Sequence, residues 1–160
     1  MTFALKYPQR TQTLIVSSSV SQIDSVLSGV SESWRAAILA RDPELLFKVT
    51  APFNFSDTWI KANQAAITAA ARRYVDLDFD SLLELMDCFT RLDLTNLLDQ
   101  INSPTLVMVG ELDILKPRKY SEIISAHIPC AQLVVVPNAG HALCMEQPGV
   151  FNTQVLGFVN

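Results

Sequence analysis

Two side chains with acid–base chemistry follow apolar runs of this 160-residue sequence, close to where each run ends. Asp113 comes shortly after the run from Thr105 to Val109, and His141 comes shortly after the run from Ala131 to Val136. A carboxylate that contacts an imidazole orients the ring and stabilises its protonated form. The pair therefore predicts general acid–base chemistry, provided that the fold brings the two side chains together.

The two apolar runs are rich in β-branched residues and predict strands that are covered on both faces of a parallel sheet. Residues 119–128, between them, have the length and apolar spacing of a crossover helix, so the segment predicts a right-handed βαβ unit. The carboxyl ends of parallel strands meet at one edge of a sheet, and neighbouring strands lie about 4.8 Å apart. Asp113 and His141 are therefore expected to reach one another through a hydrogen bond.

A third strand is predicted at residues 13–16, which would place Ser17 at the same edge of the sheet. Residues 21–100 show helical periodicity, with capping residues such as Asp42 ahead of the expected helices, and Ser56 precedes an amphipathic run to Tyr74. The predicted fold class is α/β, with a three-stranded parallel sheet. Residues 1–20 and 101–160 are expected to form the sheet part, and residues 21–100 a helical insertion.

For the other reactive side chains, the positions in the sequence favour ordinary structural roles over catalytic ones. His127 is expected at the end of the crossover helix, where a cation offsets the helix dipole. Glu111 is an alternative acid but is expected to be exposed or salt-bridged. Cys144 could pair with the nearby histidine, yet a nucleophile needs its own activating turn. Together with Cys88 and Cys130 it is expected to be a buried, reduced thiol.

Composition excludes several classes of function. The net charge is −4 and 49% of the residues are hydrophobic, which indicates one soluble globular domain and no basic stripe for nucleic acid. No apolar run is long enough for a membrane span, and the first ten residues lack the apolar core of a signal peptide, so cytoplasm is the expected location. No Gly-rich phosphate loop or metal-ligand spacing indicates a cofactor or a metal.

Two longer motifs contain the acid and the histidine. They are Pro-Thr-Leu-Val-x-x-Gly-Glu-x-Asp-x-Leu-x-Pro, from Pro104, and Val-Pro-Asn-Ala-Gly-His-Ala-x-x-x-Glu-Gln-Pro-x-x-Phe-Asn, from Val136. This pattern resembles the C-terminal part of the α/β-hydrolase family. The resemblance implies that Asp113 and His141 are the acid and base of a Ser-His-Asp triad, and that residues 21–100 form a cap over the active site.

The same resemblance implies a substrate pocket beneath the cap for a small apolar ester, lactone or related acyl compound. Aromatic side chains at helical spacing in the cap are candidate pocket walls, although such residues often form plain core. Ser17 is expected as a further wall rather than as a nucleophile, because strand-end serines ordinarily satisfy loop backbone groups. The candidate pocket residues are Ser17, Trp34, Phe55, Trp59 and Phe89.

The nucleophile of the family lies in a G-x-S-x-G turn, and no such motif occurs in the 160 residues. The resemblance places this turn just before Met1, so the chain is expected to be an incomplete hydrolase that is inactive alone. The alternative is a non-catalytic module, derived from the fold, that binds a small molecule or a partner. An in-frame G-x-S-x-G encoded upstream of the Met1 codon would distinguish the two.

The chain is also expected to associate through an open edge of the sheet. The family pairs the strand at residues 13–16 with a further strand, so here its edge should be open and apolar. A homodimer, or pairing with a missing N-terminal half, is expected to cover Leu14, Ile15, Val16 and the first helix.

Overall fold

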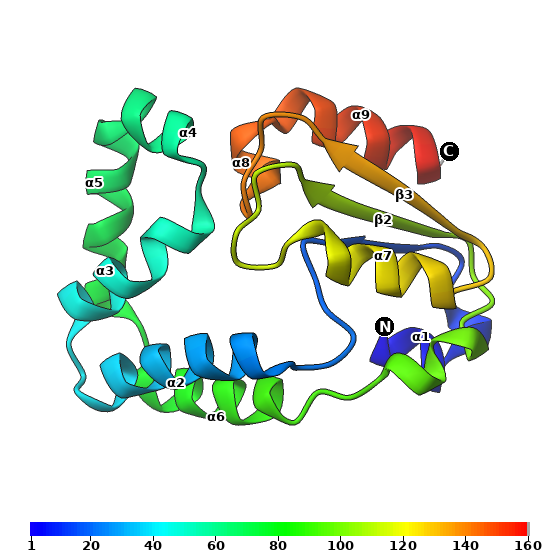
Figure 1. Ribbon diagram of the computed structural model, residues 1–160, viewed down its shortest axis with the longest axis horizontal. Helices are drawn as coiled ribbons and strands as arrows, with labels where there is room; N and C mark the ends of the chain where they lie inside the picture. Colours follow the sequence, from blue (N-terminus) through cyan, green and yellow to red (C-terminus); the bar gives the residue numbers. More distant parts are fainter. Residues whose placement is uncertain (160) are drawn as a thin grey trace.

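Three parallel strands form one sheet in the structure, a computed structural model that describes residues 1–159 (Figure 1). They are β1 (Leu14–Ser17), β2 (Thr105–Gly110) and β3 (Ala131–Val136), hydrogen-bonded in the order β1-β2-β3. Val107 of β2 is in register with Val16 of β1 and with Leu133 of β3, both in parallel. The predicted α/β class and three-stranded parallel sheet are confirmed.

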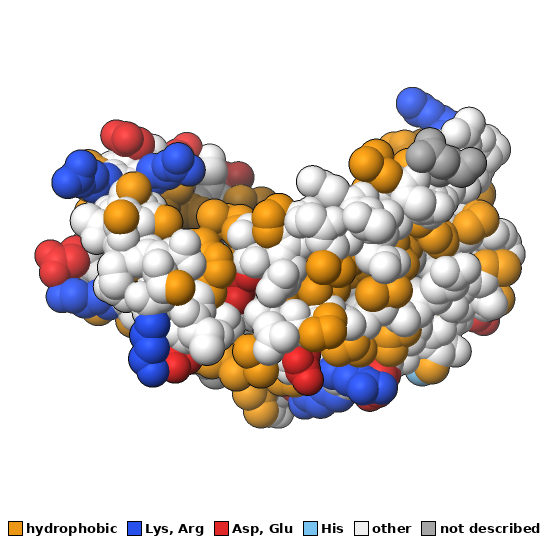
Figure 2. Space-filling view, turned by 90° about the horizontal axis from the view of Figure 1, so that it is seen from above, with side chains coloured by type: hydrophobic (Ala, Val, Ile, Leu, Met, Phe, Trp, Pro, Cys, Tyr) orange, Lys and Arg blue, Asp and Glu red, His pale blue; other side chains and the backbone are white. Residues whose placement is uncertain are grey.

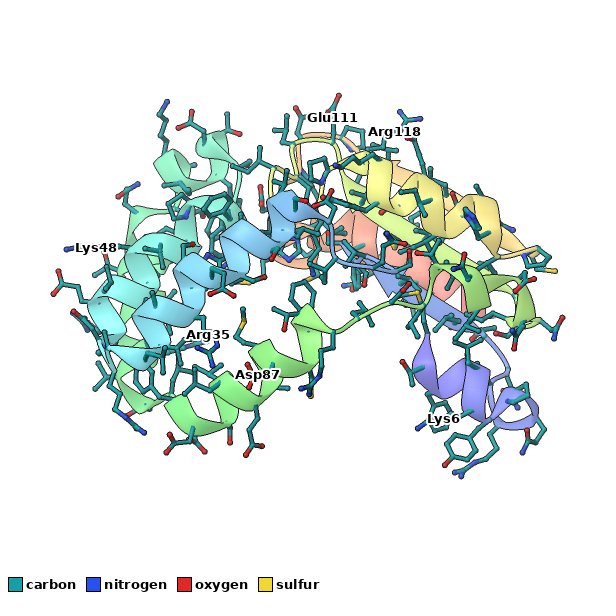
Figure 3. All side chains as sticks on the ribbon, turned by 60° about the horizontal axis from the view of Figure 1, so that its bottom comes forward. Lys6, Arg35, Lys48, Asp87, Glu111 and Arg118 are labelled. Atoms are coloured by element: carbon teal, nitrogen blue, oxygen red, sulfur yellow. The ribbon has the colours of Figure 1, made fainter. Side chains whose placement is uncertain are left out.

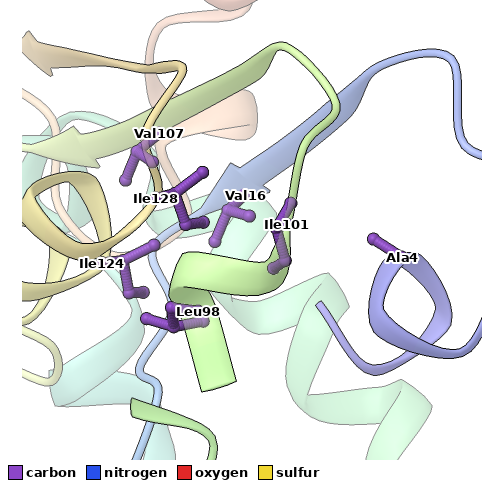
Figure 4. Close-up of a cluster of buried hydrophobic side chains, with 7 residues drawn as sticks. All are labelled: Ala4, Val16, Leu98, Ile101, Val107, Ile124 and Ile128. Atoms are coloured by element: carbon purple, nitrogen blue, oxygen red, sulfur yellow. The ribbon is translucent and has the colours of Figure 1, made fainter. Parts of the chain in front are cut away.

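One face of the sheet packs against α1 (Thr2–Lys6), the 3₁₀ helix η3 (Thr95–Gln100) and α7 (Arg118–His127). A short 3₁₀ helix η1 (Pro8–Arg10) joins α1 to β1. Figure 4 shows the hydrophobic cluster on this face, to which α1 contributes Ala4, η3 contributes Leu98 and α7 contributes Ile124. Leu98 and Ile124 are fully buried. The first helix is therefore already packed on the sheet of its own chain.

The other face of the sheet packs against α8 (Leu143–Glu146) and α9 (Pro148–Val159). Phe151, Val155 and Phe158 of α9 lie against a cluster that includes Leu106 and Met108 of β2. The outer side of α9 also carries apolar residues, among them the exposed Leu156. Figure 2 views the molecule from the side on which α9 lies and shows many hydrophobic side chains at this surface.

The chain between β1 and β2 is helical, as predicted. Its elements are α2 (Ser25–Leu39), α3 (Pro43–Asn54), α4 (Asp57–Ala62), α5 (Gln64–Arg73), the 3₁₀ helix η2 (Tyr74–Asp76) and α6 (Phe79–Thr90). Side chains of Asp24, Asp42, Ser56 and Asp78 accept hydrogen bonds from backbone N–H groups at the starts of α2, α3, α4 and α6.

One boundary differs from the sequence expectation. The amphipathic run from Asp57 to Tyr74 is not one helix but α4 and α5, which are separated at Asn63. The side-chain amide of Asn63 donates to the carbonyl of Trp59 at 2.9 Å, and its backbone leaves helical geometry. An asparagine that bonds a nearby backbone group offers the chain an alternative to helix, and this local competition explains the break.

Polar contacts tie the helical segment together and join it to the sheet. Arg35 of α2 and Asp87 of α6 form an ion pair at 3.4 Å, and Figure 3 labels both on their neighbouring helices. At the base of α2, the Asp24 carboxylate accepts hydrogen bonds from the Tyr120 hydroxyl at 2.6 Å and the Lys119 ammonium at 3.0 Å, both on α7. Asp24 thus caps one helix and bonds to another that covers the sheet.

The expected burial of the cysteines is wrong, because Cys88, Cys130 and Cys144 are free but exposed. Cys88 lies on the outward side of α6, and the other two lie in short segments next to β3 and in α8. Cys88 lies on a helix without a buried residue, and Cys144 follows the buried Leu143 on α8, so the side of the helix that each occupies faces away from the core. Within residues 1–159, no helix combines the length and apolar character that a membrane crossing requires.

Candidate active site

Asp113 is held by a tight turn that follows the most buried strand. All six residues of β2 are buried, and the Asp113 N–H donates to the carbonyl of Gly110 at 3.1 Å. The Asp113 side chain is itself fully enclosed, and its Oδ1 accepts a hydrogen bond from the backbone N–H of Lys116 at 2.8 Å. One carboxylate oxygen is thus used locally, and the other is left to point at a partner.

His141 supplies that partner. Its Nδ1 lies 3.0 Å from Asp113 Oδ2, as the parallel-strand topology predicts, and its side chain is 19% exposed. A carboxylate can only accept, so Nδ1 carries the proton in this contact and Nε2 is left free as the basic nitrogen. The arrangement is that of an oriented imidazole that can take a proton from a third group.

Close backbone approach brings the two loops together. A methyl group added at Gly110 would lie 2.2 Å from the carbonyl oxygen of Gly140, and the Leu112 N–H donates to the carbonyl of Ala139 at 2.8 Å. The turn into the histidine loop passes through Asn138, whose φ of 55° lies in the left-handed region that asparagine tolerates. Small residues here allow the acid and the histidine to share one edge of the sheet.

The histidine loop is also fastened to the helical insertion. Glu146 is buried, and its carboxylate accepts hydrogen bonds from both the backbone N–H and the hydroxyl of Ser56, at the start of α4. The Ala142 N–H donates to the carbonyl of Asn54 at 2.8 Å. A methyl group at Gly140 would fall 2.6 Å from Glu146 Oε1, so the contact requires glycine there. We call this set the Glu146–Ser56 contact.

An apolar cavity of about 350 Å³ adjoins His141. Its walls come mainly from α2, α6 and the loop after β2, and they include the candidate residues Trp34 and Phe89. Lys116 also lines it, with its ammonium group 5.2 Å from the centre of the Phe89 ring. Burial lowers the pKa of Lys116, against the smaller opposing effect of the Asp113 charge. A space of this size and lining suits a small, mainly apolar molecule.

Three of the candidate pocket residues are placed elsewhere. Phe55 lines a second cavity of about 600 Å³, which Asp113 borders as well. Trp59 stacks on Phe55 with ring centres 4.5 Å apart and lines neither cavity. Ser17 is exposed at the end of β1 and also lines neither. These assignments depend on how α3 and α4 turn relative to the sheet, which helical periodicity does not encode.

Two other predictions concern neighbours of the site. His127 ends α7, where its Nδ1 lies 2.8 Å from the carbonyl of Ile123, away from the acid–base pair. Glu111 is exposed, as expected, and accepts a hydrogen bond from the backbone N–H of Asn138 at 3.0 Å. Lys116 and Glu146 were missed by sequence reasoning, since a single lysine or glutamate carries no signal that it will be buried.

The arrangement of sheet, acid, histidine and helical insertion matches a known family. The sequence profile of that family, described as alpha/beta hydrolase fold, matches residues 1–148. The chain belongs to the α/β hydrolase fold family. The match includes the whole motif around Asp113 and the motif around His141 as far as Pro148.

Similar proteins agree with this assignment. The crystal structure of MGS-M2, an alpha/beta hydrolase enzyme from a Medee basin deep-sea metagenome library, superposes with a TM-score of 0.93 at 26% identity, over 99% of this chain and 59% of that one. A thermophilic esterase from Thermogutta terrifontis superposes with a TM-score of 0.86 at 25% identity, over 98% of this chain and 58% of that one.

Among curated sequences, a Caulobacter protein (strain K31) named "Putative carbamate hydrolase RutD" is 25% identical over 163 residues, covering all of this chain and 60% of that protein. The chain thus spans about 60% of the length of these relatives.

Proposed function

We propose that this chain carries the acid and base of a hydrolase that acts on small esters, lactones or related acyl or carbon–carbon bonds. Asp113 orients His141, and His141 Nε2 takes the proton of a nucleophilic hydroxyl and later returns one to the leaving group. The observation that carries the proposal is the 3.0 Å contact of His141 with a fully enclosed carboxylate, beside an apolar cavity.

The helical insertion, residues 21–100, acts in this proposal as a cap. Its helices α2 and α6 supply most of the cavity wall, while the sheet supplies His141 and the loop after β2. A reacting acyl group would lie between the two parts, with its apolar portion against Trp34 and Phe89. Exclusion of water from this space would strengthen the interaction between the imidazolium and the developing negative charge.

No G-x-S-x-G turn occurs in residues 1–160, so we assign the nucleophile and the oxyanion hole to a segment outside this sequence. The serines at the end of β1 are poor substitutes. Ser17 is exposed and lines neither cavity at the site, and the buried hydroxyl of Ser18 has no hydrogen-bond partner among the described residues. A hydroxyl that contacts no base is not activated as a nucleophile.

The first test uses the chain itself. Its two histidines can be followed separately by NMR, with His127 as an internal control. We expect His141 to carry its proton on Nδ1, and Asp113→Asn to change this tautomer while the signals of His127 stay unchanged. A fluorophosphonate probe should leave Ser17, Ser18 and Ser19 unlabelled. Labelling that disappears in His141→Ala would contradict the assignment of the nucleophile.

The second test supplies the nucleophile. If the DNA upstream of the Met1 codon encodes an in-frame G-x-S-x-G segment, the extended protein should hydrolyse p-nitrophenyl butyrate. His141→Ala should then lower kcat/KM by about 10³-fold, the range of a general base. His127→Ala is the matched control and should have full activity. Equal activity of His141→Ala and the parent would overturn the proposal.

A non-catalytic role is the second candidate, and it is favoured by one observation: the apolar cavity is formed although no nucleophile motif lies in this sequence. A protein of this kind would bind a small molecule without turning it over. The extended protein distinguishes the two roles, because a binding module would saturate with ligand and show no hydrolysis.

Pairing of the open sheet edge is part of the same proposal. Among residues 1–159, β1 pairs with β2 alone, so its other side offers unpaired backbone groups. A second copy of the chain or an additional strand from an N-terminal half would cover this edge. Light scattering at micromolar concentration should show a dimer or larger assembly of the chain. A monomer with rapid hydrogen exchange at residues 14–17 would contradict the pairing of two copies.

A further inference from the structure

Lys116 is an unusual lysine for this molecule. Lys48, Lys61 and Lys119 form ion pairs with Glu44, Asp57 and Asp24. Lys6 lies on the exposed side of α1, as Figure 3 shows. Lys116 is partly buried, and among residues 1–159 it has no carboxylate within ion-pair distance.

The surroundings of Lys116 are poor in polar groups. Among the described residues that line the cavity beside His141, it is the only Lys, Arg, Asp or Glu. Its ammonium group lies over the Phe89 ring, an interaction that offsets part of the cost of removing a cation from water. The Asp113 carboxylate is near enough to favour the charged form but is already occupied by His141 Nδ1 and the Lys116 N–H. The cation therefore lacks a partner of its own.

A hydrogen bond holds the Lys116 backbone close to the acid–base pair. Its backbone N–H bonds to Asp113 Oδ1, so only the short turn from Asp113 separates it from the acid. Its side chain and His141 line the same cavity. A molecule that brings a reacting carbonyl to His141 and fills this cavity must therefore meet the lysine as well as the apolar walls.

We propose that Lys116 binds a carboxylate of the substrate, so that the preferred substrates are small, mainly apolar acyl compounds that bear a carboxylate. A carboxylate accepts charge-assisted hydrogen bonds from an ammonium, and both groups gain from pairing in a space with few other polar partners. This inference rests on the proposed function for the identity of the site, but it concerns binding and can be tested without turnover.

The test compares two probes of equal length, hexanoate and hexanamide, at pH 8, where an ordinary histidine is neutral. Binding to the chain is measured by calorimetry and by the fluorescence of Trp34 in a Trp59→Phe background, since Trp34 lines the cavity and Trp59 does not. We expect hexanoate to bind about tenfold more tightly than hexanamide, the usual gain from a hydrogen bond to a charged group.

Four variants identify the group responsible. Lys116→Met keeps the length of the side chain and should abolish the preference for hexanoate, whereas Lys116→Arg should keep it. Lys61→Met, on the exposed side of α4, is the matched control and should keep it too. His141→Ala should also keep it. Thermal melting checks that each variant is folded, and Lys116→Met should melt no lower than the parent because it removes a partly buried charge.

Equal affinities of the parent for the two probes would overturn the inference, and so would absence of saturable hexanoate binding. Retention of the preference in Lys116→Met, or its loss in His141→Ala, would assign the anion to another group and overturn it as well. The proposed function is independent of these outcomes, because it is judged by the effect of His141→Ala on hydrolysis by the extended protein.

Discussion

The sheet and the helical insertion differ in how deeply their residues are buried. Every residue of β2 is buried, and its neighbours β1 and β3 are joined to it by a continuous parallel register. The insertion has a smaller buried cluster, formed by Ala37, Ile38 and Leu46 of α2 and α3, and no residue of α4, α5 or α6 is fully buried. The acid and the histidine lie on the tightly packed part, whereas most of the cavity wall lies on the other.

This difference has a consequence for function. Changes in the insertion can alter the cavity without moving Asp113 relative to His141, because the two loops that carry them contact each other directly. The Glu146–Ser56 contact and the Asp24 contacts with α7 are the places where the two parts are joined. Substitutions in the sheet, at these junctions and in the insertion should therefore change the free energy of unfolding by different amounts, and not all in the same direction.

The largest effect is expected from Gly110→Ala in the sheet. The added methyl group would lie 2.2 Å from the Gly140 carbonyl oxygen and 2.3 Å from that of Ala139, and both are backbone atoms that flexible side-chain motion cannot remove. We expect a loss of about 3 kcal/mol or more in the free energy of unfolding, at the upper end for overpacking. Urea denaturation followed by circular dichroism measures it. A change below about 1 kcal/mol would show that the loops carrying Asp113 and His141 can move apart at little cost.

Removal of the Glu146–Ser56 contact should have the next largest effect. Glu146→Ala would leave the buried N–H and hydroxyl of Ser56 without their acceptor, and we expect a loss of about 1–3 kcal/mol. Ser56→Ala removes the hydroxyl from the same contact and also the cap of α4, so we expect a comparable loss of about 1–2 kcal/mol. The NMR signal of His141 should shift in both variants while that of His127 stays unchanged. An unchanged His141 signal would mean that the insertion does not influence the histidine loop.

Substitution of Asp24 tests the second junction, at which the start of α2 contacts α7. Its hydrogen bonds from the Leu27 N–H and then from the Tyr120 hydroxyl hold the pKa of the carboxyl well below its usual range. Asp24→Ala removes a helix cap as well as the contacts with α7, and should cost about 1–2 kcal/mol. Asp24→Asn can still cap the helix and should cost less.

The same carboxyl predicts a dependence of stability on pH. Because its pKa is lower in the folded chain, its contribution is fully present above the pKa of the unfolded chain, about 3.9. It is lost as the pH falls further, through the lower folded value. Thermal melting between neutral pH and about pH 2 should therefore decline less steeply for Asp24→Asn than for the parent. Equal slopes would contradict this assignment.

The smallest change in the free energy of unfolding is expected from a substitution in the insertion, and this one should stabilise the chain. Gly29 lies inside α2, and a methyl group added there would meet no atom within 4 Å. Gly29→Ala should stabilise the chain by about 0.5–1 kcal/mol, because glycine loses more backbone freedom than alanine when a helix forms. The same substitution is thus expected to stabilise the insertion and to disrupt the sheet. Destabilisation by Gly29→Ala would mean that α2 has a packing partner on this side.

Local patterns predicted more of the sheet than of the insertion. The apolar runs before Asp113 and His141 were predicted as parallel strands, and the contact between the two side chains follows from that topology. Helix starts at Asp42 and Ser56 were also predicted, because capping is a local interaction. The break at Asn63 was missed, since periodicity continues through it while the asparagine side chain competes for a backbone carbonyl.

By itself, the sequence determined the strands, the caps and the order of acid and histidine, because each depends on residues a few positions apart. Only the tertiary structure decided which side chains meet across long separations. Glu146 and Ser56 are 90 positions apart, and neither their contact nor the need for glycine at position 140 has a local signal. The same holds for the cavity, which includes Trp34 and Lys116 but not Trp59, because the packing of α2 and α6 against the loop after β2 sets which side chains face it.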